Sequence, residues 1–276
     1  MNAAKTILIT GCSTGIGYTT AMMLKKRGHK VIATARKAAD VARLQAEGFS
    51  ALQLDLADSD SIRLAVEQTL ALTGGKLDAL FNNGAFGQPG AVEDLSREVL
   101  RFQFETNLFG THELTNRIIP VMRKQGHGRI IYNSSILGLV ALSYRGAYNA
   151  SKFALEGLAD TLRLELSGTG IRISLIEPGP ILSRFRENSF ALYQKNIDAK
   201  HSFHKAKYEA MEARLQKEGA AVPFTLPAEA VGEKVIHALE AKQPKIRYYV
   251  TFPTYLFGTL KRLLPYAWLD KLLIKV

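Results

Sequence analysis

A tyrosine and a lysine stand four residues apart, at Tyr148 and Lys152. On an α-helix, residues four apart lie on one face about one turn from each other, so a phenol and an ammonium group would share one space. An unperturbed tyrosine has a pKa of about 10, and a nearby cation favours the phenolate, which would make the hydroxyl a proton donor and acceptor closer to neutral pH. Such pairs are also common on solvated surfaces, so the rest of the chain must decide between the two interpretations.

A serine hydroxyl is expected beside this pair. Ser135 lies thirteen residues before Tyr148 and follows the apolar residues 130–132, a pattern typical of a buried strand. A hydroxyl at the carboxyl end of such a strand can reach into the crevice where parallel α/β proteins bind their ligands. Ser135, Tyr148 and Lys152 therefore form a candidate set for proton transfer.

The size and composition of the chain favour a globular protein that is soluble or peripheral to a membrane. Its 276 residues, 47% of them hydrophobic, can bury the core of one large α/β domain or at most two domains. The single Cys12 excludes an internal disulfide and agrees with a reducing compartment. We see no signal peptide and no apolar run of the roughly 18 residues that a membrane span needs. The expected location is the cytoplasm, either free or peripheral to a membrane.

The positive charge is concentrated near the C-terminus. The formal net charge is +11, and from residue 242 onward seven basic residues face the single acid Asp270. This distribution points to an anionic surface or ligand near the C-terminus, and it argues against a uniformly basic nucleic-acid binder.

A glycine-rich turn follows the first apolar segment. Residues 5–10 are typical of a short buried strand, residues 11–17 contain three glycines, and residues 18–27 have the pattern of an amphipathic helix before a second strand at 31–35. Glycines between a strand and a helix let backbone N–H groups hold a pyrophosphate at the helix N-terminus. A dinucleotide is therefore the expected ligand.

The end of the second strand indicates which dinucleotide. Proteins that prefer NAD usually place an acid here for the ribose hydroxyls, whereas this strand ends in Arg36 and Lys37. Without a carboxylate to repel a 2′-phosphate, and with two cations to attract one, NADP is the predicted cofactor, with Ser13 as a second donor. The alternative is that both residues begin a solvated helix.

Strands and helices alternate through most of the chain, which predicts one domain over residues 1–276. Such alternation implies a doubly wound (Rossmann) α/β fold, with a parallel sheet of seven strands and helices on both faces. Two segments depart from it: 181–226, expected to form a helical lid beside the site, and the apolar, basic extension 252–276. The extension could contact a membrane, a partner subunit or the substrate pocket. Further strands are expected at 51–55, 77–82, 128–134, 171–177 and 247–251, and further helices at 59–73, 96–123, 144–166 and 227–241.

Several motifs together resemble one protein family over residues 5–185. The glycine turn with Thr10, the pair Asn82-Asn83, Asn107, Ser135, the Tyr148/Lys152 pair and Pro178-Gly179 are similar, in order and spacing, to the short-chain dehydrogenase/reductase family. Residues 150–157 and 261–265 resemble its hydroxysteroid and retinol dehydrogenase branch, and within it the bacterial NADP-dependent aldehyde reductases.

The resemblance implies a role for each motif residue. Tyr148 would protonate the carbonyl oxygen, Lys152 would lower the Tyr148 pKa and hold the nicotinamide ribose, Ser135 would bind the substrate oxygen, and Asn107 would hold a water in a proton relay. Hydride transfer needs a polarised carbonyl, a proton donor and a fixed nicotinamide face, and it needs no metal. The implied cofactor-binding residues are Gly11, Ser13, Thr14, Gly15, Ile16, Gly17, Arg36, Asp55, Leu56, Asn83, Gly84, Tyr148, Lys152, Pro178, Gly179, Ile181 and Ser183.

The predicted function is NADPH-dependent reduction of carbonyl compounds, aldehydes and also ketones, with apolar substrates favoured by the aromatic lid and tail. The alternatives are an NADP-linked alcohol, steroid or retinol dehydrogenase working oxidatively, and a non-catalytic NADP-binding or membrane-associated module. Two positions depart from the family pattern: Gly84-Ala85 inverts the usual order, and Ser183 replaces a threonine. The family also implies a homo-oligomer, a dimer or a tetramer.

Overall fold

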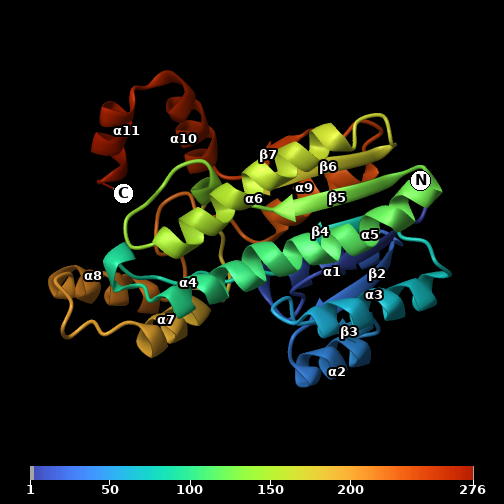
Figure 1. Ribbon diagram of the computed structural model, residues 1–276, viewed down its shortest axis with the longest axis horizontal. Coiled ribbons are helices and arrows are strands. Elements are labelled where there is room, and N and C mark those ends of the chain that lie inside the picture. Colours follow the sequence, from blue (N-terminus) through green and yellow to red (C-terminus); the bar gives the residue numbers. More distant parts are fainter. Residues whose placement is uncertain (1–2, 276) are drawn as a thin grey trace.

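The computed structural model describes residues 3–275 and is built on a parallel sheet of seven strands (Figure 1). The strand order is β3-β2-β1-β4-β5-β6-β7, and each neighbouring pair is parallel. The chain therefore builds outward in two directions from β1 and β4, which opens a crevice at their carboxyl ends. The predicted doubly wound α/β fold is confirmed. The strands are β1 (Thr6–Ile9), β2 (Lys30–Ala35), β3 (Ser50–Gln53), β4 (Ala79–Asn82), β5 (Gly128–Asn133), β6 (Ile171–Glu177) and β7 (Arg247–Tyr249).

Helices cover both faces of this sheet. Successive strand residues point to opposite faces, so Ile7 and Ile9 pack into one hydrophobic cluster while Leu8 packs into the other. The first cluster lies under α1, α2 and α9, and the second under α3, α5 and α6. Both faces of the central strands are thus buried, as parallel sheets require. The helices are α1 (Gly15–Lys26), α2 (Ala38–Ala46), α9 (Glu229–Glu240), α3 (Ser59–Thr73), α5 (Thr111–Gln125) and α6 (Gly146–Glu165).

The long helix expected over 96–123 is interrupted near its middle. Ser96 caps α4 (Arg97–Phe104) by accepting a hydrogen bond from the Val99 N–H at 3.3 Å. A π-helical turn, Glu105–Gly110, then leads into α5. A π-helical turn contains an extra residue relative to the α-helix and leaves backbone groups without their usual partners, and such turns are frequent at functional sites.

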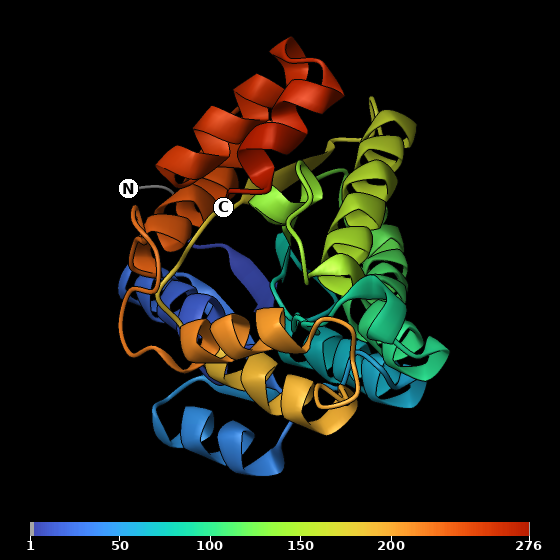
Figure 2. The same cartoon turned by 90° about the vertical axis from the view of Figure 1, so that its left-hand side faces the viewer.

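The lid and the tail lie on opposite sides of the carboxyl edge of the sheet (Figure 2). The predicted lid contains α7 (Phe185–Asn196) and α8 (Lys205–Gln216), held together by a small cluster around Tyr193 and Tyr208. The tail folds as α10 (Phe252–Leu263) and α11 (Tyr266–Leu273). No helix within residues 3–275 is long and apolar enough to cross a bilayer.

Candidate active site

The turn after β1 has the backbone that a phosphate-binding loop needs. Gly11 and Gly15 have φ angles of 70° and 61°, in the left-handed region that favours glycine. A Cβ at Gly17 would lie 2.3 Å from the Gly11 carbonyl oxygen, so the strand and the helix approach each other only because this residue has no side chain. Thr14, at the N-cap of α1, makes no capping hydrogen bond through its side chain, which leaves N–H groups of the first turn available to an anion.

Thr10, which belongs to the glycine-turn motif, and Asn133, which the sequence analysis did not single out, fix this turn against the rest of the crevice. The Thr10 hydroxyl accepts hydrogen bonds from the N–H groups of Asn83 at 2.9 Å and Gly84 at 2.7 Å, and the Asn83 amide donates to the Thr10 carbonyl at 2.9 Å. The Asn133 amide, at the end of β5, donates to Asn83 Oδ1 at 3.0 Å. The loops after β1, β4 and β5 are therefore held together. Asn133 could have been identified in the sequence as a polar side chain at the end of an apolar strand.

Gly84 occupies a space that accepts little more than a hydrogen atom. A Cβ there would lie 2.9 Å from Leu56 Cδ1 and 3.1 Å from the Thr10 hydroxyl oxygen. The inverted Gly84-Ala85 order thus puts a glycine where a Cβ would be crowded.

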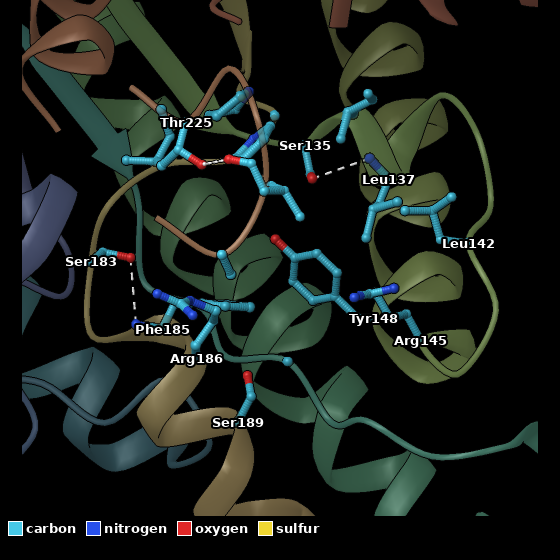
Figure 3. A pocket seen from close by; sticks show the side chains of 18 of the residues that line it. Ser135, Leu137, Leu142, Arg145, Tyr148, Ser183, Phe185, Arg186, Ser189 and Thr225 are labelled. Carbon is cyan, nitrogen blue, oxygen red and sulfur yellow. Dashed lines mark hydrogen bonds between the residues drawn. The ribbon is translucent and has the colours of Figure 1, made fainter. Parts of the chain in front are cut away.

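Ser135, Tyr148 and Lys152 converge on one cavity. Ser135 follows β5, and the other two lie one turn apart on α6. Figure 3 shows the Ser135 and Tyr148 hydroxyl groups directed into the same space. Ser135 Oγ accepts a hydrogen bond from the Leu137 N–H at 3.1 Å, so its own proton remains free to be donated to a substrate oxygen. Lys152 Nζ donates to the Asn133 carbonyl at 2.7 Å and lies 5.5 Å from the centre of the Tyr148 ring.

Burial dominates the protonation of this pair. It raises the pKa of Tyr148 to about 12, while the neighbouring Ser135 hydroxyl acts in the opposite direction. It lowers the pKa of Lys152 to about 8, against the attraction of Glu156. The Lys152 ammonium group is directed to the Asn133 carbonyl, so the expectation that it lowers the Tyr148 pKa stays a prediction for the complex with the cofactor. Tyr148 therefore keeps its proton through the neutral range, as a proton donor must.

Asn107 lies in the π-helical turn and is buried. Its amide accepts a hydrogen bond from the Phe86 N–H at 3.1 Å and donates to the Phe86 carbonyl at 2.9 Å and to Ser151 Oγ at 3.2 Å. The Ser151 hydroxyl in turn donates to the Tyr148 carbonyl at 2.9 Å. Asn107 thus connects the loop after β4 to the helix that carries Tyr148. Its role in a water relay stays a prediction.

The cavity has a volume of about 720 Å³ and is lined in part by residues of the predicted lid and of the tail. Phe185 of α7 packs edge-on against the Tyr148 ring at 5.4 Å, and Leu256 of α10 is part of the opposite wall. The predicted residues that line the cavity are Gly11, Ser13, Thr14, Gly15, Ile16, Asn83, Gly84, Ser135, Tyr148, Lys152, Pro178, Gly179, Ile181 and Ser183. Those outside its lining are Gly17, Arg36, Asp55, Leu56 and Asn107.

The residues predicted to bind the adenosine half of the cofactor lie at the ends of β2 and β3. Arg36 follows β2 and is exposed, and Asp55 lies two residues beyond β3, with Oδ1 accepting a hydrogen bond from the Ala57 N–H at 3.0 Å. Arg43 of α2 donates to the Ser13 carbonyl at 2.6 Å and so fixes the glycine turn from this side. Nothing in the sequence distinguished Arg43 from other basic helix residues.

A family model for the short chain dehydrogenases matches residues 5–193. The chain belongs to the short-chain dehydrogenase family. This family uses a nicotinamide dinucleotide, and the glycine turn, with its uncapped helix N-terminus, fits the pyrophosphate of such a cofactor. No group of three His, Cys, Asp or Glu side chains in the described chain is placed to hold a metal ion.

Curated relatives cover nearly the whole chain. An uncharacterized oxidoreductase of Escherichia coli K12, YbbO, is 43% identical over 269 residues, which cover 98% of this chain and 94% of that protein. The NADPH-dependent 3-dehydrocapnine reductase of Ornithobacterium rhinotracheale is 30% identical over 97% and 95% of the two chains. Human 17-beta-hydroxysteroid dehydrogenase type 1 is 34% identical over 264 residues, which cover 90% of this chain and 78% of the human protein. The resemblance to the hydroxysteroid dehydrogenases is thus confirmed.

Proposed function

We propose that this short-chain dehydrogenase is an NADPH-dependent reductase that converts carbonyl compounds, aldehydes first and ketones second, to alcohols. One observation carries the proposal: the hydroxyl groups of Ser135 and Tyr148 meet in a largely apolar cavity beside the glycine turn, and Tyr148 keeps its proton at neutral pH (Figure 3). A carbonyl oxygen placed between two such donors is polarised and receives a proton as it is reduced.

Each residue of the set has one task in this reaction. Ser135 donates a hydrogen bond to the carbonyl oxygen, and Tyr148 donates the same oxygen a hydrogen bond and then its proton. Lys152 donates one N–H group to the Asn133 carbonyl. Its other N–H groups stabilise the tyrosinate that results and bind the ribose hydroxyls of the cofactor. The bound nicotinamide supplies a hydride to the carbonyl carbon. Asn107 positions α6 through Ser151.

The preference for NADPH is proposed from Arg36. Its guanidinium group makes no hydrogen bond or ion pair within residues 3–275, and it lies at the strand end where a 2′-phosphate is recognised. The NADPH-dependent relative from Ornithobacterium supports the same choice. Ser13, on the adjoining turn, is the second donor proposed for the phosphate.

Arg36→Asp should lower the ratio of kcat/KM for NADPH over NADH by about 100-fold or more. The change removes a charge-assisted hydrogen bond, worth about 1.5–3 kcal/mol, and adds repulsion between a carboxylate and the phosphate. Steady-state kinetics with both cofactors measures the ratio, and Arg101→Asp, an equal charge change on an exposed turn of α4, is the control. An unchanged ratio in Arg36→Asp would mean that other residues hold the phosphate.

The proposed reaction is tested by NADPH consumption with purified protein and a panel of aliphatic, aromatic and terpenoid aldehydes, ketones and steroids. We expect turnover with at least the aldehydes, and faster turnover with NADPH than with NADH. Oxidation of the matching alcohols with NADP, in preference to any reduction, would favour the dehydrogenase alternative. Tight NADPH binding without turnover of the panel in either direction would favour a binding module.

We further propose that the tail rests on an anionic membrane surface. Leu263, Tyr266 and Trp268 are exposed on its two helices, close in sequence to the exposed cations Arg262 and Lys271. Apolar side chains flanked by cations match the interface of an anionic bilayer. Because Leu256, Phe257 and Leu273 of the same segment line the cavity, an apolar substrate could enter directly from the bilayer.

Trp268→Ser should weaken binding to vesicles that contain anionic lipid by about 10-fold, because a side chain that is 66% exposed would lose its contact with the bilayer. Co-sedimentation with vesicles measures the binding. Phe203→Ser is the matched control, since this residue is 94% exposed and belongs to the lid, which lies on the opposite side of the carboxyl edge from the tail. Equal losses in both variants, or no binding by the unaltered protein, would contradict the membrane contact.

The proposed homo-oligomer has candidate contact surfaces on α4 and α6. Leu100, Phe102, Phe153 and Leu164 are exposed on these helices, and Phe109 is exposed on the π-helical turn that follows α4. Analytical ultracentrifugation distinguishes a monomer from the dimer or tetramer that we propose.

A further inference from the structure

Two of the arginine side chains that line the cavity, Arg145 and Arg214, have neither a carboxylate partner nor a short hydrogen bond in the described chain. Arg145 precedes α6 and Arg214 lies near the end of α8, and both are only partly exposed. Within residues 3–275 no carboxylate lies within 4 Å of either guanidinium group. The Arg145 guanidinium makes one long hydrogen bond, to the Ser143 carbonyl at 3.4 Å, and the Arg214 guanidinium makes none in that part of the chain.

This arrangement is unfavourable for the protein by itself. Burial, together with repulsion from Arg214, lowers the pKa of Arg145 to about 10. Burial and repulsion from Arg186 likewise lower the pKa of Arg214. Arg186 differs from the other two, because it donates to the carbonyls of Arg214, Lys217 and Gly219 and so has a structural role at the end of α8. Unpaired, half-buried cations are costly and usually mark a place where an anion binds.

The backbone that presents Arg145 is strained. Tyr144, just before it, has a φ angle of 60°, a conformation that is rare for a bulky aromatic residue. It is held there by the lid: its hydroxyl contacts His204 Nδ1 at 3.1 Å, and its ring packs against Tyr208 at 5.9 Å. The Gly90 N–H also donates to its carbonyl at 3.0 Å. Strain that is maintained by several contacts is common at binding sites.

Arg145 and Arg214 lie close enough to repel each other, on the side of the cavity that the lid lines together with Arg184 and Arg186. Arg145 is three residues before Tyr148, and Figure 3 shows its guanidinium group beside the Tyr148 ring. Arg214 comes from the lid, whereas the tail lines the cavity with Phe252, Leu256 and other apolar side chains, and with Lys275 as its single charged residue. A ligand that fills the cavity would therefore have an anionic end toward the lid and an apolar body toward the tail.

We propose that Arg145 and Arg214 bind an anionic group of the carbonyl substrate, such as a carboxylate, sulfonate or phosphate. The substrate class is then an amphipathic oxo acid with an apolar chain, and no longer a purely apolar aldehyde. This inference rests on the proposed reductase function and specifies its substrate. Planar guanidinium groups suit such anions, because they donate two parallel hydrogen bonds to one group.

The test compares oxo acids of increasing chain length with their methyl esters, as substrates for reduction by NADPH. For the best chain length we expect a KM about 10-fold or more lower for the acid than for the ester, the range of a charge-assisted hydrogen bond. Arg145→Gln or Arg214→Gln should remove this difference while leaving kcat and the KM of the ester nearly unchanged. Lys207→Gln, an equal charge change on the outer face of α8, should preserve it.

Three results would overturn the inference. Equal KM values for acid and ester in the unaltered protein would show that no anion is recognised. If Arg145→Gln and Arg214→Gln raise the KM of the acid and of the ester by the same factor, the arginines only maintain the shape of the site. Weaker binding of NADPH in these variants, with an unchanged preference for the acid, would assign them to the cofactor.

A binding measurement keeps this inference separate from the reductase proposal. Calorimetric titration of the protein with NADPH and a long-chain carboxylate that lacks a carbonyl should show binding that the matching alcohol does not show. The difference should disappear in Arg145→Gln and in Arg214→Gln. If inorganic phosphate binds at the arginines but neither the carboxylate nor an oxo acid does, the subsite takes a free anion, and the assignment to a substrate is wrong. Failure of all reduction, with intact carboxylate binding, would contradict only the reductase.

Discussion

Tyr148→Phe should lower kcat for carbonyl reduction by about 100-fold or more and leave the affinity for NADPH nearly unchanged. The loss corresponds to removal of a general acid, whose contribution is typically 100- to 10,000-fold. The ring that packs against Phe185 is retained in the variant, so the cavity keeps its shape. Only the hydroxyl group beside Ser135 disappears. Single-turnover kinetics and NADPH fluorescence titration measure the two quantities separately.

Tyr132→Phe is the matched control for this change. Tyr132 is also buried and hydroxylated, but it lies within β5, donates to Thr115 Oγ1 at 3.2 Å and does not line the cavity. Its loss should cost stability and leave kcat close to that of the unaltered protein. Near-normal turnover in Tyr148→Phe would remove Tyr148 from the proton-donor role, and an equal loss in both variants would indicate a general effect of removing a buried hydroxyl.

The second large effect concerns stability. Arg247→Leu should lower the free energy of unfolding by about 3–5 kcal/mol, the cost of leaving a buried ionic group without its partner. Arg247 binds Glu177 at 2.5 Å and Asp160 at 2.5 Å, and it also contacts Glu156. The Glu177 side chain is fully buried, so its carboxylate cannot exchange the arginine for water. Denaturant unfolding at neutral pH measures the loss.

The destabilisation should depend on pH in a defined direction. Burial and the Glu156 charge raise the pKa of Glu177 to about 8, and Arg247 opposes this shift. Without Arg247, the Glu177 carboxyl group would bind a proton in the folded protein at pH values where the unfolded chain is ionised. The folded state then binds more protons than the unfolded state, so the stability of Arg247→Leu should fall as pH rises from about 4.5 toward 8.

Two comparisons test this explanation. Arg63→Leu removes an exposed arginine that bridges Glu67 and Asp60 on α3, and it should cost less than about 1 kcal/mol. Adding Glu177→Gln to Arg247→Leu should recover part of the lost stability, because a neutral amide does not have to bind a proton to remain buried without Arg247. A cost in Arg247→Leu as small as that of Arg63→Leu would show that the buried cluster is not held by Arg247.

Much of the fold could be predicted because local pattern and tertiary environment agree. The structure has β6 and α3 with the predicted bounds, 171–177 and 59–73. Asp58 caps α3 by accepting a hydrogen bond from the Asp60 N–H at 3.0 Å, and Gly74 ends it with a φ angle of 64°. The Ser135, Tyr148 and Lys152 side chains meet as predicted because the strands are parallel and end at one edge.

Other features depend on contacts between distant segments and left no local signal. The π-helical turn is fixed by the contact of Asn107 with Phe86, a residue in another loop. The Lys152 ammonium group donates to the carbonyl of Asn133 in β5, and the four-residue spacing on the helix does not predict this partner. Arg247 was counted among the charges of a cationic C-terminal surface, but it is an internal ion-pair partner, because α6 and β6 bring three carboxyl groups to it.

The central claim, carbonyl reduction by NADPH, is tested most directly by isotope transfer. The protein is supplied with an aldehyde and NADPH that carries deuterium at the transferable position of the nicotinamide, and the alcohol is analysed by mass spectrometry. We predict an alcohol that has gained one deuterium on the former carbonyl carbon, formed faster than with deuterated NADH and absent with Tyr148→Phe. Binding of NADPH without labelled alcohol from any aldehyde or oxo acid, or equal labelling from NADH, would contradict the claim.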